Sequence, residues 1–385
     1  MNLTNKHLPD GWTSIRFEDA FERLPKTKIK AGEGLEQGKY KFFTSSDEQK
    51  KFLDSYEFDG EHLILGTGGV ASIHYCNEKF STSTDCFVMK LKAKDILLKY
   101  IYYFFRSRFY LLEEGFRGAG LKHLSRHYLN EISIPYPESK ETQKKIISIL
   151  EKAESLKTSR EEADKLTNEL LKSVFCEVFG DPVRNEKGWE QSVLKEKSEI
   201  IQIGPFGTQL HVEDYTTGGI PLVNPMHIIN KKIVPDFNFT VSPKKYDELS
   251  NYHMKVGDII MGRRGEMARC ALVTTKEDGW LCGTGSLFIR PKNDVNSLFL
   301  LFCLTHASMK KVLENNSQGV TMSNLNLSII NNLKIIVPPR KLQNKFAEIS
   351  ERLNSINEKQ ATSSDKIDQL IYTLMQKAFS GELFG

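Results

Sequence analysis

The sequence lacks the segments that carry a chain into or across a membrane. None of its 385 residues belongs to an apolar run near the roughly 18 residues that a transmembrane helix needs. The N-terminal segment MNLTNKHLPDGW has no apolar core of signal-peptide length. We therefore expect a cytoplasmic protein that does not associate with a membrane.

Cysteine is sparse, and its spacing disfavours a disulfide frame and a zinc site. The six cysteines are widely scattered, form no C-x-x-C pair and have no histidine nearby at ligand spacing. They are Cys76, Cys86, Cys176, Cys270, Cys282 and Cys303. We expect reduced thiols with a structural role, which also fits the cytoplasm.

The common catalytic motifs are missing as well. There is no G-x-x-x-x-G-K-[ST] nucleotide loop, no H-E-x-x-H zinc motif and no G-x-S-x-G nucleophile turn. The tripeptide PPR at 338–340 lacks the preceding Asp or Asn and the following aromatic residue of an amino-methyltransferase motif. We predict that the chain is not an enzyme and that it has no cofactor of its own.

The charge balance permits a nucleic-acid partner without requiring one. The chain has 53 Lys and Arg against 49 Asp and Glu, a net charge of +4. Hydrophobic residues make up 39% and charged residues 26%, as in an ordinary globular protein. The length exceeds one typical domain, so two or more cores are expected.

Two long segments have the apolar periodicity of helices that pair with another helix. They begin after Pro135 and Pro137 and after Pro338 and Pro339, and they end on Phe179-Gly180 and Phe379-Ser380-Gly381, where glycine suits a left-handed cap. Apolar residues recur at alternating steps of three and four. We call these positions the apolar seams: Ile146, Ile149, Ala153, Leu156, Ala163, Leu166, Leu170 and Val174 in the first helix, and Leu342, Phe346, Ile349, Leu353, Ile356, Ile367, Leu370 and Leu374 in the second.

The globular segments are also repeated, which makes the chain a tandem duplication. LPDGWTSIRFEDAFE at 8–22 corresponds to NEKGWEQSVLKEKSEI at 185–200, and 61–95 resembles 257–294. We predict an α+β fold with two mixed α/β recognition domains, separated by two long antiparallel coiled-coil helices and related by a pseudo-twofold internal repeat. The predicted boundaries are 1–137 and 182–338 for the globular domains, and 138–181 and 339–385 for the helical spacers.

Each globular domain is expected to contain short buried strands and one amphipathic helix. The strands are HLILG, CFVMKL, GDIIMG and SLFIRP, which are rich in branched residues and are bounded by glycine or proline. The helices are LLKYIYYFFRSRFYLLEEG and VNSLFLLFCLTHASMKKVLENNS. The two domains diverge most between about 25 and 55 and between about 203 and 245. One scaffold used twice with different loops suits two different targets at a fixed separation.

Two corresponding loops are candidates for DNA contact. GRRGEMAR at 262–269 carries Arg263, Arg264 and Arg269, and arginine can bind guanine bidentately in the major groove. The matching first-domain loop, GTGGVAS at 66–72, has no arginine, and its candidates are Thr67, Gly68 and Ser72. A solvated basic turn is the alternative interpretation, at about even odds, because any surface carries such clusters.

A second cluster precedes each long helix. In the first domain it contains Arg117, Lys122, His123 and Arg126, and in the second it contains Thr321 and Asn324. Such loops beside a helix could contact phosphate or base edges. For the histidine by itself, an ordinary surface role is favoured.

The order of these motifs resembles the specificity subunits of type I restriction-modification systems. The resemblance rests on IGPFGTQLHVEDYTTGGIPLVNPMHI at 203–228, which includes the further candidate Gln209, and on four later motifs. These are GDIIMGRRGE, GVTMSNLN, LKIIVPPRKLQNKFAEI and LIYTLMQKAFSGEL. It implies a non-catalytic, DNA-reading subunit that binds double-stranded DNA at a bipartite target.

The resemblance also implies partners. These are two adenine methyltransferase subunits and two ATP-dependent restriction subunits, which carry S-adenosylmethionine, ATP and catalysis. Two other interpretations of the residues remain open at this point. The helices would also serve a coiled-coil protein adaptor without DNA specificity, and an enzyme that modifies DNA unaided is disfavoured by the missing motifs.

Overall fold

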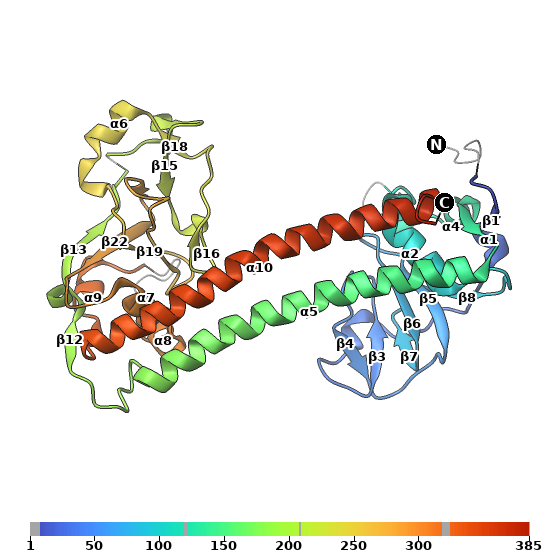
Figure 1. The fold of residues 1–385 in the computed structure, drawn as a ribbon, viewed down its shortest axis with the longest axis horizontal. Helices are drawn as coiled ribbons and strands as arrows, with labels where there is room; N and C mark the ends of the chain where they lie inside the picture. The colour runs from blue at the N-terminus through green and yellow to red at the C-terminus, as the bar shows by residue number, and fades with distance from the viewer. Residues whose placement is uncertain (1–7, 119–121, 208, 318–323, 385) are drawn as a thin grey trace. The chain divides into compact units, whose positions relative to one another are not determined.

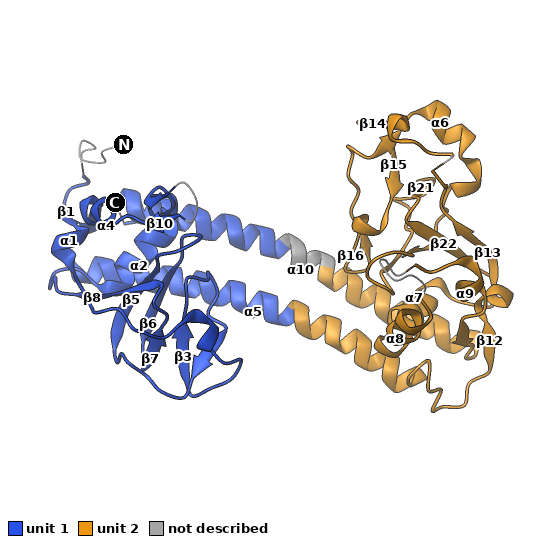
Figure 2. Cartoon of the chain, turned by 180° about the vertical axis from the view of Figure 1, so that it is seen from behind, with its two compact units in different colours: residues 1–163, 360–385 blue, residues 164–359 orange. Residues whose placement is uncertain are grey.

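The structure is a computed structural model of the chain, and it describes residues 8–118, 122–207, 209–317 and 324–384, without the side chains of 358–362. The chain divides into two compact units (Figure 2). Unit 1 comprises residues 1–163 and 360–385, and unit 2 comprises residues 164–359. Each unit thus contains one globular part and a portion of each long helix, while the four predicted domain boundaries stay a prediction.

Unit 1 is built around a four-stranded antiparallel sheet in the order β2-β8-β5-β6. Its strands are β2 (Phe21–Arg23), β8 (Cys86–Leu91), β5 (Glu61–Gly66) and β6 (Ile73–Asn77). A second sheet has the order β4-β3-β7, from β4 (Lys51–Leu53), β3 (Tyr40–Phe43) and β7 (Phe80–Thr82). Two further pairs are β1 (Trp12–Arg16) with β11 (Ser133–Pro137), and β9 (Phe116–Arg117) with β10 (His123–Leu124).

Unit 2 repeats the four-stranded antiparallel sheet, in the order β13-β22-β19-β20. Its strands are β13 (Ser198–Ile203), β22 (Ser286–Pro291), β19 (Ile259–Gly262) and β20 (Cys270–Leu272). The strands predicted from HLILG, CFVMKL, GDIIMG and SLFIRP are confirmed as β5, β8, β19 and β22. The pair β12 (Gln191–Val193) with β23 (Lys334–Ile336) corresponds to β1 with β11.

The remaining strands of unit 2 lie mainly in the segment where the two sequences diverge. The sheet β14-β18-β15-β21 consists of β14 (Tyr215–Thr216), β18 (Thr240–Val241), β15 (Ile220–Val223) and β21 (Leu281–Cys282), and β16 (Ile228–Ile229) pairs with β17 (Lys232–Ile233). The parallel pair of β15 with β21 corresponds to that of β3 with β7 in unit 1, whereas the strands that join these pairs differ between the two units.

The short helices correct one prediction. Unit 1 has α1 (Phe17–Ala20), α2 (Leu98–Ser107), α3 (Tyr110–Glu113) and α4 (Arg126–Glu131), and unit 2 has α6 (Pro243–Glu248), α7 (Ser297–Thr305), α8 (Ala307–Asn316) and α9 (Leu327–Asn331). A single amphipathic helix per unit was predicted, whereas each splits in two. In unit 2 the break is at His306, whose extended backbone (ψ 145°) ends α7 and whose side chain caps α8 by accepting from the Ser308 N–H. The segment α7 is not amphipathic, because residues 298–304 are all buried.

The two long helices and their glycine caps are confirmed. The structure has α5 (Lys140–Phe179) and α10 (Arg340–Ser380), and the capping residues Gly180 and Gly381 have φ angles of +75° and +85°. Within each unit the two helices run antiparallel (Figure 1). The α+β fold class, with two long antiparallel helices and an internal repeat, is therefore confirmed.

A buried glutamine joins each long helix to its globular part. The Gln143 amide group donates to the carbonyl oxygens of Asp95 and Pro137 at 2.9 Å each, and its Oε1 accepts from the Leu97 N–H at 2.8 Å. In unit 2, Gln343 makes the same three bonds to Asp294, Pro338 and Asn296. Both glutamines are 0% exposed, so a fully satisfied polar side chain fixes the start of each helix.

Apolar packing holds the helix ends against their units. In unit 1, Ile146, Leu150 and Ala153 of α5 lie in one core with Met375, Ala378 and Phe379 of α10 and with the aromatic face of α2. In unit 2, Leu171, Phe175 and Phe179 of α5 lie in one core with Phe346 of α10 and with α7. The globular part thus covers a second side of each helix pair.

Several residues of the predicted apolar seams are exposed although both helices form as predicted. The exposed seam residues are Leu156 (56%), Leu166 (57%), Leu170 (48%), Ile356 (46%) and Leu370 (48%). Two helices in contact cover only a narrow stripe of each other, and the buried face can lie beside the predicted seam: Leu170 is exposed, whereas Leu171 next to it is buried in the core of unit 2. The ion pair between Lys157 Nζ and Asp368, at 2.7 Å in unit 1, joins exposed side chains of the two helices.

Candidate nucleic-acid interface

The 66–72 loop of unit 1 is a tight turn between β5 and β6. The Gly66 N–H donates to the Ser72 carbonyl at 3.0 Å, and the Thr67 N–H donates to the Asp85 carbonyl at 2.8 Å. Gly69 sits at the turn with φ +81°, a conformation that side chains disfavour. These bonds define the backbone of the loop.

The 122–124 segment lies against this loop. The Gly69 N–H donates to the Lys122 carbonyl at 3.3 Å, and the Leu124 N–H donates to the Thr67 carbonyl at 3.1 Å. His123 Nδ1 is 3.2 Å from the same carbonyl, so Nδ1 carries the proton. Two clusters more than 50 residues apart in the sequence are therefore brought together.

The 262–269 loop of unit 2 has the same construction. The Gly262 N–H donates to the Arg269 carbonyl at 2.8 Å, and Gly265 has φ +75°. The Leu325 N–H donates to the Arg263 carbonyl at 2.9 Å, as Leu124 does to Thr67. The bridge between Arg264 and Asn324 corresponds to that between Gly68 and His123. Each unit thus presents one loop paired with one segment, in the same register but with different side chains.

Three predicted contact residues have buried side chains. Thr67 is 4% exposed, Ser72 1% and Arg263 3%. The Arg263 guanidinium donates to the Asn324 Oδ1 at 2.9 Å and, through Nε and Nη2, to the Thr284 carbonyl at 3.3 and 3.1 Å. Burial, and secondarily the charge of Arg264, lowers the pKa of this guanidinium. The expected base contacts by these three side chains do not fit their burial, and we assign them to the support of the loops.

Arg264 and Arg269 differ in how far they are committed to other residues. Arg269 is half-buried and donates to the Pro225 carbonyl at 3.1 Å and to the Glu266 carboxylate at 2.9 Å. Hydrogen bonds from Arg269 and Lys310 lower the pKa of Glu266 to about 2. Arg264 is exposed and, within the part of the chain that the structure describes, its side chain makes no hydrogen bond or ion pair. It is the arginine of this loop with all its donors available.

The remaining candidates lie on the surface or outside the described residues. Arg117, Lys122, His123, Arg126 and Gln209 are exposed, and Gly68 and Asn324 are half-buried. Arg117 donates to the Glu114 carbonyl, and the Gln209 Oε1 accepts from the Tyr252 hydroxyl at 2.7 Å. Thr321 lies outside the described residues.

A model of the type I restriction modification DNA specificity domain matches residues 9–171 and, a second time, residues 186–369. These two ranges include most of the chain and coincide with its two repeats. The chain belongs to the type I restriction-modification specificity family. The resemblance found in the sequence motifs is thereby confirmed.

Relatives of this specificity protein come from archaea and bacteria. The MjaIX specificity subunit of Methanocaldococcus jannaschii is 26% identical over 75% of this chain and 69% of its own length. The MjaVIII specificity subunit of the same organism is 21% identical over 98% and 94%, and the EcoDI specificity subunit of Escherichia coli is 20% identical over 98% and 89%. The similarity therefore extends over nearly the whole chain.

Solved structures show the same fold. The specificity subunit from M. genitalium has a TM-score of 0.63 at 17% identity, covering 98% of both chains. A chain from a study of complex assembly in a type I system has a TM-score of 0.58 at 17% identity, covering 98% of this chain and 100% of that one.

Specificity subunits are the non-catalytic components of restriction-modification complexes, so the prediction that this chain is not an enzyme is confirmed. In this family they bind DNA and assemble with methyltransferase and restriction subunits. Of the helices in the described residues, none is both long enough and apolar enough to cross a bilayer.

Sequence reasoning missed some groups of this specificity subunit near the 66–72 loop. Ser45 Oγ donates to the Asp85 carbonyl at 2.7 Å and accepts from the Gly68 N–H at 3.4 Å, so it links the loop to the segment that follows β3. Ser45 lies in the divergent 25–55 segment, and Pro225, which has no hydroxyl, takes its place in unit 2, so no repeated residue marked it.

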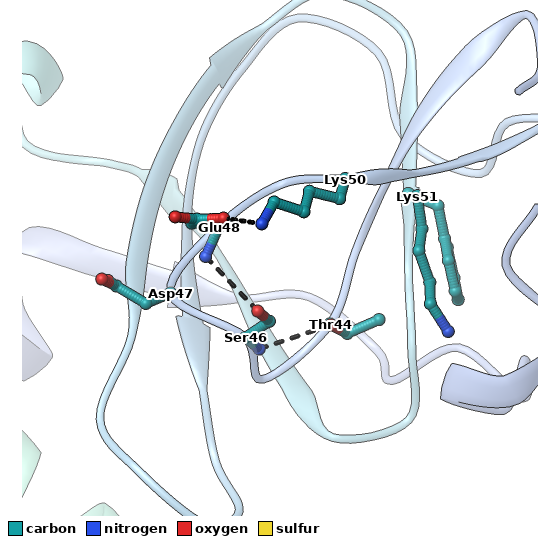
Figure 3. Close-up of a pocket in the computed structure, with 7 residues that line it drawn as sticks. Thr44, Ser46, Asp47, Glu48, Lys50 and Lys51 are labelled. Carbon is teal, nitrogen blue, oxygen red and sulfur yellow. Dashed lines mark hydrogen bonds and ion pairs between the residues drawn. The ribbon is translucent and has the colours of Figure 1, made fainter. Parts of the chain in front are cut away.

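The pocket of about 410 Å³ in that same segment offers less (Figure 3). Its lining residues are Phe42, Thr44, Ser46, Asp47, Glu48, Lys50 and Lys51. Lys50 forms an ion pair with Glu48, and the Lys51 ammonium donates to the Ala31 carbonyl at 2.8 Å. Two carboxylates offset two ammonium groups, so this pocket does not attract an anionic backbone.

Proposed function

We propose that this chain is the DNA sequence-recognition subunit of a type I restriction-modification complex. Residues 1–137 and 182–338 are its two recognition domains, and each binds one half of a bipartite double-stranded DNA target. The recurrence of the paired loop and segment in both units, with different side chains at equivalent positions, is the observation that supports this proposal. A repeated fold that carries different exposed side chains in its two copies suits two different half-sites.

The proposed contact surface consists of the exposed and half-buried candidates. In unit 1 these are Gly68, Arg117, Lys122, His123 and Arg126, and in unit 2 they are Gln209, Arg264, Arg269 and Asn324. Arg264 is suited to a guanine in the major groove, because its donors have no partner among the described residues and arginine can form two bonds to O6 and N7. Lys122 and Arg117 are suited to phosphate.

The helical spacers 138–181 and 339–385 set the spacing of the half-sites. About 40 helical residues at 1.5 Å each extend about 60 Å. Once one domain has bound, the other binds at a high effective concentration, provided that the DNA spacing fits.

The partners carry the chemistry. Two methyltransferase subunits methylate adenine at the target that this chain selects, and ATP-dependent restriction subunits cleave unmodified DNA. The exposed seam residues of α5 and α10 provide apolar surface for such subunits. A cytoplasmic location, where DNA and these partners are found, completes the proposal and agrees with the free state of the cysteines.

Long-read sequencing of the host genome tests the recognition role. Methyladenine is expected at one split motif, and deletion of this gene is expected to abolish methylation at that motif. Methylation that persists at every split motif after deletion would refute the proposal.

The adaptor alternative is separated by the salt dependence of binding. A DNA-reading subunit releases counterions from phosphates, so its affinity falls steeply as the salt concentration rises. A coiled-coil adaptor gives no such dependence, and a flat profile in filter binding would favour it.

A further inference from the structure

Three cationic side chains of unit 1 surround one aromatic ring. The guanidinium carbons of Arg23 and Arg126 lie 5.3 and 5.4 Å from the centroid of the Phe87 ring, and the Lys26 ammonium lies 5.1 Å from it. Arg23 ends β2, Phe87 lies in β8 and Arg126 begins α4. Phe87 itself is only 4% exposed, so the three cations lie over a buried ring. We call Arg23, Lys26 and Arg126 the Phe87 cation cluster.

The cluster has no acidic partner among the described residues. None of the three cations forms an ion pair there, although the Lys26 ammonium donates to the Thr84 carbonyl at 2.8 Å. Arg23, Phe87 and Arg126 line a pocket of about 320 Å³. Glu18 also lines it, but its carboxylate is ion-paired with Arg16. Cations held together without an anion repel one another, and the ring only partly offsets that repulsion.

The fold does not require these cations, because unit 2 builds the same frame without them. Arg23 lies opposite Met89 in the sheet, as Ile201 lies opposite Ile289, so Ile201 is the equivalent of Arg23. By the same register, Gly204 occupies the place of Lys26, and Leu287 that of Phe87.

The third position of the cluster has also lost its charge in unit 2. Leu327 occupies the place of Arg126. Leu325 and Leu124 donate the same backbone hydrogen bond to their loops, and Leu327 and Arg126 are the second residues after them. All three positions of the cluster are thus uncharged in unit 2.

The cluster adjoins the 66–72 loop. Lys26 binds the carbonyl of Thr84, and the next carbonyl, of Asp85, accepts the Thr67 N–H. Arg126 follows by three residues His123, which forms a bridge to Gly68. Unpaired cations beside a loop that faces DNA are placed to meet its backbone.

We infer that the Phe87 cation cluster binds a backbone phosphate of the DNA at the first half-site, and that unit 2 has no equivalent anchor. This inference rests on the proposed function. A phosphate oxygen accepts bonds from both guanidinium groups and the ammonium, and its charge replaces the missing acidic partner. The first half-site then contributes more of the salt dependence of binding than the second does.

The test measures DNA binding against salt for the full chain, in the complex isolated from its host, with a duplex that carries the methylated motif. Because the three cations share one phosphate, the double variant Arg23→Gln, Arg126→Gln is expected to reduce the slope of log affinity against log salt by about 0.9, the value of one phosphate contact in B-DNA, and each single variant is expected to reduce it by a part of that value. Lys26→Gln, at an exposed position where folding is not at risk, is expected to reduce it in the same direction.

Three further measurements make the result specific to the cluster. Arg23→Lys and Arg126→Lys retain the charge and are expected to keep the slope. Lys94→Gln, at an exposed lysine of unit 1 outside the cluster, is the matched control and is expected to keep it too. Base preference at both half-sites is expected to be unchanged, because phosphate contacts carry no sequence information.

The outcomes separate this inference from the proposed function. The phosphate anchor alone is overturned if the unaltered complex binds DNA and its slope is unchanged both in Lys26→Gln and in a double Arg23→Gln, Arg126→Gln variant. A fall of the same size in Lys94→Gln also overturns it. Saturable binding of inorganic phosphate that the double variant loses, without a change in the DNA slope, assigns the pocket to a free anion and overturns the DNA contact. A complex that binds no DNA overturns the proposed function itself.

Discussion

Replacing Arg263 is expected to lower the stability of unit 2, whereas replacing its neighbour Arg264 is expected to weaken DNA binding. Arg263 is 3% exposed and holds Asn324 and the Thr284 carbonyl, whereas Arg264 is exposed. Arg263→Ala removes charged hydrogen bonds to two acceptors. At about 1.5 kcal/mol for each acceptor, unit 2 is expected to lose about 3 kcal/mol of its free energy of unfolding. Arg264→Ala is expected to change it by less than about 0.5 kcal/mol, as is usual for surface substitutions.

Arg264→Ala is expected to weaken DNA binding although it leaves the stability nearly unchanged. Loss of a bidentate base contact is worth about 1 to 3 kcal/mol, which corresponds to about 5- to 150-fold in affinity for the second half-site. The first half-site is expected to keep its affinity in both variants, because the changed residues lie in unit 2.

Urea unfolding followed by tryptophan fluorescence provides the stability measurement. Trp189 and Trp280 lie in unit 2 and Trp12 in unit 1, so a Trp12→Phe background reports on unit 2 alone. With a slope of about 3 kcal/mol per molar urea, the midpoint of Arg263→Ala is expected about 1 M lower. Arg263→Lys is expected to fall nearly as far, because an ammonium cannot reproduce the guanidinium fork. Equal midpoints for Arg263→Ala and Arg264→Ala would refute the assignment of a supporting role to one and a contact role to the other.

Four other predictions address the helices, their anchors, one exposed thiol and one partly buried lysine. Seven residues added to both long helices at matching levels keep the apolar seams in phase. They are expected to lengthen the gap between the half-sites of the methylated motif by about 10 Å, or about three base pairs. An unchanged gap would contradict the spacer role. Gln143→Leu leaves one N–H and two carbonyls unpaired and is expected to lower the free energy of unfolding by about 2 to 4 kcal/mol. Gln343→Leu is expected to lower it by a similar amount, and Lys152→Leu, at an exposed position of α5, is the control. Of the six cysteines, Cys176 is exposed and the others are buried, so a thiol reagent is expected to modify one thiol rapidly in the native chain and none in Cys176→Ser. Burial, followed by the charge of Lys172, lowers the pKa of Lys231 from 10.5 to about 8. Between these pH values the unfolded chain binds more protons than the folded chain, so the free energy of unfolding rises with pH there. Lys231→Met is therefore expected to be more stable than the unaltered chain at pH 7 and to lose that advantage by pH 10.

Several features of the fold could be predicted because their signals are local. The start of each long helix after prolines, and its end at Gly180 or Gly381, depend on backbone preferences of a few adjacent residues. The buried strands were visible as short branched runs for the same reason. The break at His306 was missed, because the apolar pattern continues through it while the cap depends on one side-chain bond to Ser308.

The apolar seams show where periodicity stops being sufficient. Spacing identifies residues that one face of a helix presents, but it does not say how wide the covering surface is. Leu170 of the predicted seam is 48% exposed, whereas its neighbour Leu171 is 4% exposed because the core of unit 2 covers that side of α5.

The sequence by itself determined the duplicated plan, the two long helices, the family and the two loops that correspond between the repeats. These follow from spacing and order along the chain, which any copy of the sequence displays. Only the tertiary structure decided which side chains of those loops face outward, because burial depends on residues far away in the chain. Asn324 and Thr284 bind Arg263 and leave Arg264 free, and Arg23, Lys26 and Arg126 meet at Phe87 although about 100 residues separate the first from the last.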